Sequence, residues 1–416
     1  MILCYSVLLA FILFPYQLAI AVSPVILIPG DGGSRLQVKL NKTSTVSHFC
    51  EKTSSDYVDL WVSLEEFTPV SLPCFADNLR LVYDMVHRKT YDSPGVHVRA
   101  PGFGGTETIA WLESYHVYLT SYFASMLTML EKLGYKTNAT VFGAPYDFRR
   151  AINEQGEWFL NFTKLVEHAY TTNNNTAVTL IAHSMGNMMT LYWLHNKPKA
   201  WKQKYVKRFI AISAPWGGTI KPIRALVAGD KFGIYTMTPL VVRAAQRSLP
   251  STHFLISDPR YWEETAILAI NRGVKNYTLQ NLKELYSDLN ITNEWQMFQD
   301  SRNLLDPTKP PEVETHCLHG AGVDTPYQFE WNEKYKWPDT QPLVVNGDGD
   351  GTVVLRSLAG CLLWKQAEPM RYQSFDKIEH LAALKSPDVI NYVYKVLLPE
   401  SPLLMEMKIK INSFNN

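Results

Sequence analysis

Short apolar runs that end at tight turns recur along this chain of 416 residues. Each run has the length and composition of a strand that is buried on both faces. The four clearest runs are PVILIPG (24–30), AVTLIA (177–182), RFIAISAP (208–215) and PLVVNGDGDG (342–351). Segments with helical spacing lie between them, among them residues 118–135 and 157–172. Because strands that alternate with helices form parallel sheets, the pattern predicts an α/β protein.

Two regions, residues 47–77 and 217–337, interrupt this alternation. The first is bounded by cysteines and has the sparse apolar spacing of a small amphipathic unit, whereas the second is rich in Tyr, Trp and Pro. Both are interpreted as insertions over a core, which a chain of this length can accommodate. A composition of 46% hydrophobic and 19% charged residues excludes a disordered or coiled-coil protein.

The first 21 residues predict entry into the secretory pathway. They contain no charged residue and end in Ala19, Ile20 and Ala21, a pattern that signal peptidase accepts. We interpret residues 1–21 as a signal peptide; an uncleaved anchor is the alternative, since a basic residue is lacking. Six N-glycosylation sequons support the interpretation, beginning at Asn41, Asn138, Asn161, Asn174, Asn276 and Asn290.

Four of the five cysteines follow the predicted signal peptide, which contains Cys4. An even number in an oxidising compartment indicates two disulfides, and buried free thiols are the alternative. Proximity in the sequence favours Cys50 with Cys74, which leaves Cys317 with Cys361.

The charge distribution bears on the partners of the protein. A formal net charge of +1 gives no case for nucleic-acid binding. Protonation of the eleven histidines in acid would make the protein positive and attract it to an anionic membrane. We therefore expect a phospholipid surface, preferably anionic, as the partner of a monomeric protein.

Ser184 is the candidate nucleophile. It lies in AHSMG (182–186), between a predicted strand and the helix-like segment 187–196. A nucleophile elbow needs small residues two positions before and two positions after the serine, and Ala182 and Gly186 satisfy this requirement.

A serine of this kind requires a histidine base and a carboxylate, which in such folds follow in the chain order Ser, Asp or Glu, His. His380 is the only histidine after the acidic turn that carries Asp348 and Asp350. The order therefore selects His380 as the base and leaves the choice between the two aspartates open. His316 and His319 have no matching second pair of metal ligands, and we expect neither a metal nor a cofactor.

An oxyanion hole requires two backbone N–H groups, one directly after the nucleophile and one after an early strand. Met185 supplies the first, and PGDGG (29–33) offers Asp31 for the second. An ionised carboxylate would repel the oxyanion, so Asp31 near the site would favour its neutral form and activity in acid. The alternative is an ordinary turn aspartate that faces solvent.

With these residues placed, the chain resembles the lecithin:cholesterol acyltransferase and lysosomal phospholipase A2 family. The matching stretches are PGDGG, RLVYD, VRAPGFG, GAPYDFRR, AHSMGNM, SAPWGG, GDGDGTV and EHLAAL. The resemblance implies an α/β-hydrolase core at 22–46, 96–216 and 338–400, a membrane-binding subdomain at 47–77, and a cap with a lid at 78–95 and 217–337. It also assigns Asp350 to the catalytic triad and a disulfide to Cys50 and Cys74.

The resemblance further implies an acidic phospholipase A and O-acyltransferase. Such an enzyme forms an acyl-enzyme on Ser184 and transfers the acyl group to water or to a lipid alcohol such as ceramide. Asp31 and Asn187 stand where the plasma acyltransferase has cysteine, which favours the lysosomal branch and a lysosomal or secreted location. A secreted sterol acyltransferase and a non-catalytic lipid-binding protein are the alternatives.

Four apolar residues of the first insertion are the predicted membrane contacts, because apolar side chains on a constrained loop can enter the headgroup boundary. They are Trp61, Leu64, Val70 and Leu72. The alternative is that they form a small internal core.

Overall fold

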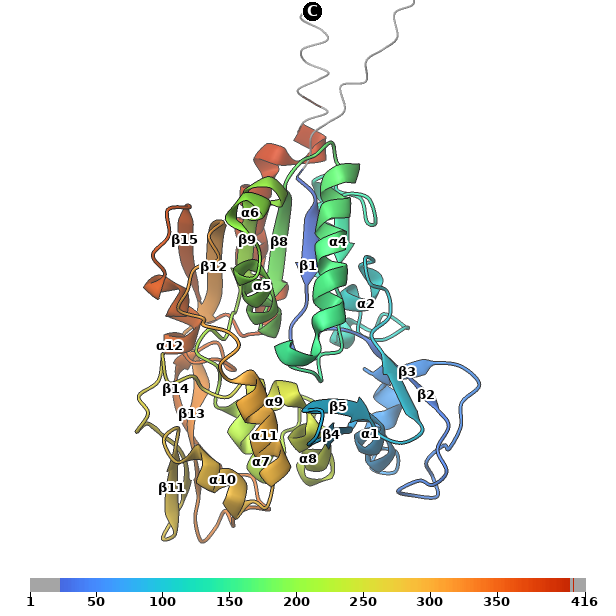
Figure 1. Ribbon diagram of the computed structural model, residues 1–416, viewed down its shortest axis with the longest axis vertical. Coiled ribbons are helices and arrows are strands. Elements are labelled where there is room, and N and C mark those ends of the chain that lie inside the picture. Colours follow the sequence, from blue (N-terminus) through green and yellow to red (C-terminus); the bar gives the residue numbers. More distant parts are fainter. Residues whose placement is uncertain (1–22, 405–406, 408–416) are drawn as a thin grey trace, which may run out of the picture.

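A six-stranded parallel sheet forms the centre of the computed structural model, which describes residues 23–404 and 407 (Figure 1). The predicted signal peptide lies outside the described residues. In order across the sheet, the strands are β15 (Met370–Asp376), β12 (Glu314–Ala321), β9 (Val206–Ile212), β8 (Val178–His183), β1 (Val25–Ile28) and β7 (Val141–Gly143). The prediction of a parallel α/β sheet is confirmed.

Helices cover both faces of this sheet. One face carries α3 (Ala124–Lys132) and α13 (Pro387–Leu397), and the other carries α4 (Gly156–Thr172), α5 (Met185–His195) and α6 (Lys199–Tyr205). Side chains of β1 alternate between the two faces: Val25 and Leu27 pack with the first group, and Ile26 and Ile28 with the second. Together with the direct step from β8 into α5, this arrangement is an α/β-hydrolase fold.

A second sheet holds the acidic turn. Its strands are β11 (Lys275–Thr278), β10 (Ile267–Asn271), β13 (Val323–Trp331) and β14 (Leu343–Gly349). The run at 342–351 was expected in the parallel sheet, but β14 pairs antiparallel with β13 and is largely exposed. That expectation is wrong because the neighbouring β13 supplies a hairpin partner.

The boundary at residue 337 also differs from the expectation. β12 lies in the central sheet between β9 and β15, although residues 217–337 were assigned to the cap. The helices of that region are α7 (Lys221–Ala228), α8 (Pro239–Ser248), α9 (Pro250–Phe254), α10 (Leu282–Asp288) and α11 (Thr292–Ser301). The insertion over the core is therefore interrupted by one strand of the core itself.

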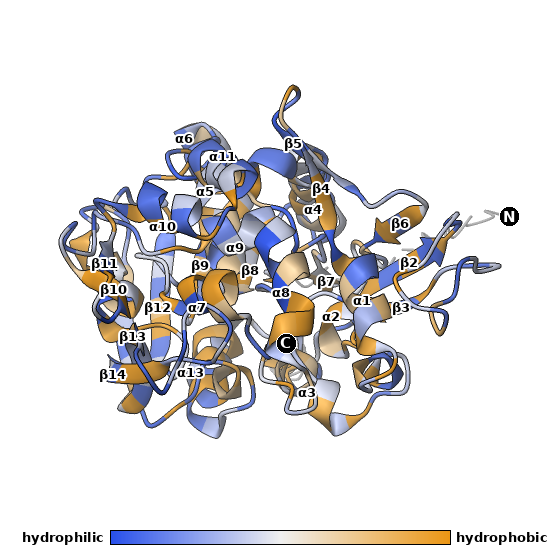
Figure 2. Ribbon diagram, turned by 90° about the horizontal axis from the view of Figure 1, so that it is seen from below, coloured by the Kyte–Doolittle hydropathy of each residue, from blue (hydrophilic) through white to orange (hydrophobic). Residues whose placement is uncertain are grey.

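The first insertion is joined to its surroundings by a third sheet. This sheet consists of β3 (Val58–Trp61), β2 (Leu36–Leu40) and β6 (Val96–Arg99), followed in space by α1 (Leu72–Leu79) and the hairpin of β4 (Leu81–Asp84) and β5 (Lys89–Asp92). Because β3 pairs with β2, the insertion is continuous with the segment before it. Figure 2 shows α8 between α1 and α7, so the two insertions meet below the core.

The remaining helices are short. They are α2 (Glu107–Ala110), α12 (Leu355–Leu358) and the 3₁₀ helices Leu64–Phe67, Tyr118–Thr120, Ile152–Glu154, Ala359–Leu363, Ala382–Leu384 and Leu398–Glu400. Two disulfides are present, Cys50–Cys74 and Cys317–Cys361. Among the described residues, no helix combines the length and the apolar character that crossing a bilayer requires.

Candidate active site

Ser184 stands at the tight turn between β8 and α5. Its φ of 52° and ψ of −130° lie outside the regions that L-residues favour, as in a strained nucleophile elbow. A Cβ added to Gly186 would lie 2.3 Å from the Pro29 carbonyl oxygen, and Ala182 is fully buried between β1 and β9. Small residues at these two positions therefore allow the turn to form.

His380 connects Ser184 to Asp350. Its Nε2 lies 2.9 Å from Ser184 Oγ, and its Nδ1 lies 2.7 Å from Asp350 Oδ2. Because a carboxylate only accepts hydrogen bonds, Nδ1 carries the proton, and Nε2 is free to accept the serine proton. Ser184 follows β8, Asp350 follows β14 and His380 comes after β15. The ends of three strands that are far apart in the sequence therefore bring these residues together.

The Asp350 carboxylate is fully buried and well supported. It accepts the amide N–H groups of Thr352 at 3.1 Å and Val353 at 2.8 Å. Burial by itself raises the pKa of Asp350, but the charge and hydrogen bond of His380 together with the two amides lower it below the ordinary value. Asp348, the other candidate, instead accepts the Gly322 amide at 2.7 Å.

Residues 29–33, which we call the oxyanion turn, pass directly beside the serine. A Cβ added to Gly30 would lie 2.5 Å from Ser184 Cβ. Within residues 23–404 and 407, the amide N–H groups of Asp31 and Met185 donate to no protein acceptor. Two unpaired donors beside the nucleophile are what a developing oxyanion requires.

The Asp31 carboxyl has a pKa well above the ordinary value of an aspartate. Burial raises its pKa to about 7, although a hydrogen bond from the Gly32 amide opposes the rise. Below this pH the side chain is neutral, and above it a negative charge develops next to the candidate oxyanion hole.

His183, directly before Ser184, connects the backbone of His380 with the oxyanion turn through hydrogen bonds. The His380 carbonyl only accepts, so His183 Nε2–H donates to it at 3.0 Å and Nδ1 accepts from Tyr122 O–H at 2.5 Å. The Tyr122 oxygen in turn accepts the Gly30 amide at 3.0 Å. Burial lowers the pKa of His183 to about 3, so this hydrogen-bond chain keeps a neutral imidazole in acid.

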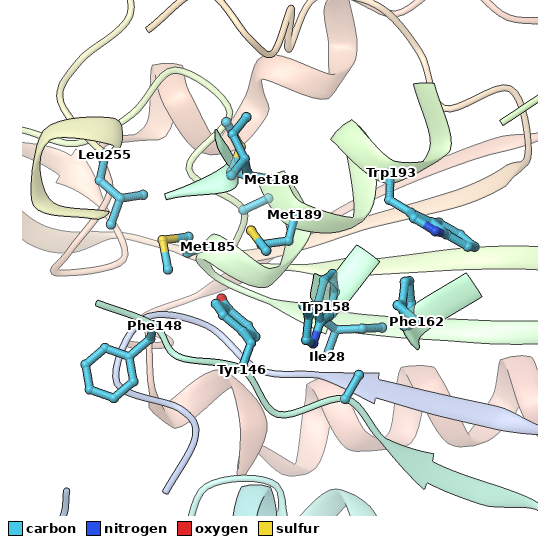
Figure 3. Close-up of a cluster of buried hydrophobic side chains, with 14 of the residues drawn as sticks. Ile28, Tyr146, Phe148, Trp158, Phe162, Met185, Met188, Met189, Trp193 and Leu255 are labelled. Carbon is cyan, nitrogen blue, oxygen red and sulfur yellow. The ribbon is translucent and has the colours of Figure 1, made fainter. Parts of the chain in front are cut away.

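Buried apolar side chains border the oxyanion turn and α5 (Figure 3). Tyr146, Phe148 and Met185 belong to one cluster with Leu255, and none of the four is more than 8% exposed. The site therefore adjoins an apolar interior.

The predicted membrane contacts divide into two pairs. Leu64 and Val70 are exposed, but Trp61 and Leu72 are only 7% and 1% exposed. The prediction is wrong for Trp61 and Leu72 as the protein is folded here. Trp61 packs against Phe148 from the core, and its indole N–H donates to the Gly32 carbonyl at 2.7 Å.

The six sequons lie where a glycan has access. Asn41, Asn138, Asn174, Asn276 and Asn290 are exposed, and Asn161 is partly exposed. Their occupancy stays a prediction.

Known proteins of one family resemble this chain over most of its length. Residues 57–386 match the family model described as lecithin:cholesterol acyltransferase. The chain is 40% identical to the human "Lysosomal phospholipase A and acyltransferase" over 90% of each chain, and 36% identical to the Gallus gallus "Phosphatidylcholine-sterol acyltransferase" over 86% of each. A solved structure, "The crystal structure of Tle4-Tli4 complex", is similar at a TM-score of 0.48 and 11% identity, covering 92% of this chain and 99% of that chain. The chain belongs to the lecithin:cholesterol acyltransferase family.

Proposed function

We propose that this protein is a serine phospholipase A and O-acyltransferase of acidic compartments that cleaves acyl esters of glycerophospholipids. The observation that carries the proposal is the hydrogen-bonded sequence from Ser184 Oγ through His380 to Asp350, at 2.9 and 2.7 Å. The human relative named for a phospholipase A and acyltransferase activity is 40% identical to this chain over 377 residues.

In the first half of the reaction, His380 Nε2 takes the Ser184 proton while Oγ bonds to the ester carbonyl carbon. The oxyanion receives the amide N–H groups of Asp31 and Met185. The His380 imidazolium, stabilised by the Asp350 carboxylate, then gives its proton to the departing lysophospholipid oxygen. The ester bond breaks and the acyl group remains on Ser184.

In the second half, His380 deprotonates an incoming hydroxyl group. Attack by water releases a fatty acid, whereas attack by a lipid alcohol such as ceramide gives an acylated lipid. Both outcomes regenerate the Ser184 hydroxyl, so one acyl-enzyme serves hydrolysis and transfer.

The regions around the core take supporting roles in this proposal. We assign residues 230–237 as a lid, because Phe232 packs on Trp61 at a ring-centre distance of 5.7 Å and a Cβ added to Gly233 would meet no atom within 4 Å. Disulfides and sequons fit the secretory pathway. The destination is the lysosome or the extracellular space, and the partner is a phospholipid membrane met by a monomer.

The test is a product assay on phosphatidylcholine vesicles that contain ceramide, run below and above the Asp31 pKa of about 7. Wild-type protein should release fatty acid and acylate ceramide, more so in acid. Ser184→Ala should lose at least about 10⁴-fold of both products and all labelling by a fluorophosphonate. Activity confined to neutral pH and sterol acceptors would instead support the secreted sterol acyltransferase, and labelling that survives Ser184→Ala would contradict the nucleophile.

A further inference from the structure

A groove lies where the first turns of α4 approach β5 and the segment that follows β5 (Figure 1). Its volume is about 710 Å³, which falls within the range of about 300–1,000 Å³ that is typical of ligand sites. Residues from 89–103 and from 145–161 line it, and none of the catalytic residues Ser184, Asp350 and His380 does. The groove is therefore a candidate binding site separate from the catalytic triad.

Buried polar contacts fix the shape of this groove. Arg150 donates to the Thr90 carbonyl at 2.6 Å and to Glu154 Oε2 at 2.9 Å, and Glu154 Oε1 accepts the Thr90 amide at 3.0 Å. Thr90 is fully buried, and the Glu154 side chain is only 2% exposed. Because these bonds tie β5 to the segment before α4, the two sides of the groove are held together and the groove is preformed.

Aromatic rings and unpaired polar groups stand next to each other in the lining. Tyr91 and Phe103 are 47% and 38% exposed. Within the part of the chain that the structure describes, the exposed side chains of His97 and Glu157 have no hydrogen-bond or ion-pair partner. Flat apolar faces beside groups that bind hydroxyls suit a ligand with apolar ring faces and polar edges, as a pyranose sugar has.

Asn161, the first residue of the sequon NFT, is itself part of the lining. It lies on α4 three residues after Trp158 and four after Glu157, so these three side chains share one face of the helix. Both of the others also line the groove. A sugar that is attached to the Asn161 amide nitrogen therefore begins at the groove.

We propose that an N-linked oligosaccharide on Asn161 lies in this groove, with its sugar rings packed on Tyr91 and Phe103. The covalent bond to Asn161 favours this occupant over a free ligand, because it gives the sugar a high effective concentration at the groove. A glycan held in this way joins the hairpin of β4 and β5 to α4 and shields both from solvent. The proposal concerns the surface of the protein and does not depend on the proposed hydrolysis.

The test measures how fast an endoglycosidase releases each glycan from the folded protein. The full chain is expressed in cells that make only oligomannose glycans and is treated with endoglycosidase H without denaturant, and each sequon is followed by peptide mass spectrometry. If the Asn161 glycan occupies the groove for about nine-tenths of the time, its release should be roughly tenfold slower than release from the exposed Asn290. Unfolding the protein should make the two rates equal.

Variants separate packing on the rings from simple crowding. Tyr91→Leu and Phe103→Leu keep apolar bulk but remove the ring, and each should speed release from Asn161 about 2–10-fold without a change at Asn290. Tyr91→Trp retains an aromatic face and should keep release slow. Tyr115→Leu is the matched control, because Tyr115 is 86% exposed and lies outside the groove lining, and both rates should stay at their wild-type values.

Three outcomes would overturn the proposal. One is an Asn161 that carries no glycan. Another is release from Asn161 that is as fast as from Asn290, or equally slow in wild type and in both leucine variants, with unfolding midpoints that show all proteins folded. The third is a loss of long-chain ester hydrolysis in Tyr91→Leu without a change in glycan release, which would assign the groove to lipid. Because no lipid is present during glycan release, failure of the proposed chemistry appears only in the separate product assay.

Discussion

Two apolar segments reach the oxyanion turn from different sides, yet their side chains end in opposite environments. Trp61 donates its indole N–H to the Gly32 carbonyl, and Tyr122 accepts the Gly30 amide. Trp61 is buried, whereas Tyr118 and Leu119, which precede Tyr122, are 74% and 79% exposed. Similar aromatic and aliphatic residues are present in both segments, so composition alone does not tell which segment is buried. The packing partners that the rest of the chain supplies decide it.

The largest expected effect is on the free energy of unfolding and comes from changing Trp61, the buried residue in this comparison. Trp61→Ala should lower the free energy of unfolding by about 3–5 kcal/mol, because it removes an aromatic side chain from a packed cluster. Tyr115→Ala, on the exposed side, should change it by no more than about 0.5 kcal/mol. Urea unfolding of both variants checks the difference, and similar losses would show that the two segments are equally buried in solution.

Tyr122→Phe tests the hydrogen-bond chain that runs from the Gly30 amide through Tyr122 to His183. Loss of the hydroxyl leaves His183 Nδ1 and the Gly30 amide without their partner, at a cost of about 1–3 kcal/mol. We expect kcat on vesicles to fall about 10–100-fold, with a smaller change in KM, because the oxyanion turn and the His380 backbone lose their common support. Tyr118→Phe is the control, since this tyrosine is 74% exposed. Equal kcat values for the two variants would exclude a positioning role for Tyr122.

The parts of the site that follow local patterns could be predicted from the sequence. A strand, a serine between small residues and a helix place Ser184, and chain order places His380. The role of His183 could not be predicted, because it depends on Tyr122 and on a backbone carbonyl that lies 197 residues away. Trp61 had equally little local signal, since its partner Phe148 comes from the core.

The strands of the central sheet likewise divide into those that local patterns predicted and those that depend on distant partners. β1 is an uninterrupted apolar run and β8 and β9 are largely apolar, and all three were predicted. In contrast, β12 carries histidine and cysteine and leads into a hairpin instead of a helix. Pattern rules therefore assigned it to the cap. Its place in the central sheet comes from pairing with β9 and β15.

Asp31→Asn tests the ionisation of the oxyanion turn, to which both Trp61 and Tyr122 are hydrogen-bonded. Because the pKa of Asp31 is raised to about 7, the wild-type side chain ionises as the pH rises through that value. If the neutral form is the active one, activity should fall roughly tenfold for each pH unit above it, and Asn should remove this component. Stability also falls with rising pH, because the folded state binds the Asp31 proton more tightly than the unfolded state. The loss develops between about pH 4, where the unfolded carboxyl ionises, and about pH 7, where the folded one does. A pH profile of Asp31→Asn that matches the wild type would contradict this account.

The smallest expected effect concerns the exposed end of the first insertion. Val70→Ser should change the free energy of unfolding by less than about 0.5 kcal/mol, since its side chain is already 53% exposed. Thermal unfolding checks this, and a larger loss would mean that Val70 is covered in solution by a part of the protein that leaves it open here.

The two disulfides close covalent rings, and each ring contains at least one residue that belongs to the candidate active site or contacts it. Trp61 lies within the ring from Cys50 to Cys74, and Asp350 within the ring from Cys317 to Cys361. Local opening of β3 or of the β13–β14 hairpin cannot carry these residues far, because each stays tethered at both ends. A reducing environment would lift both tethers at once, so the redox state of the compartment limits how long the site survives partial unfolding.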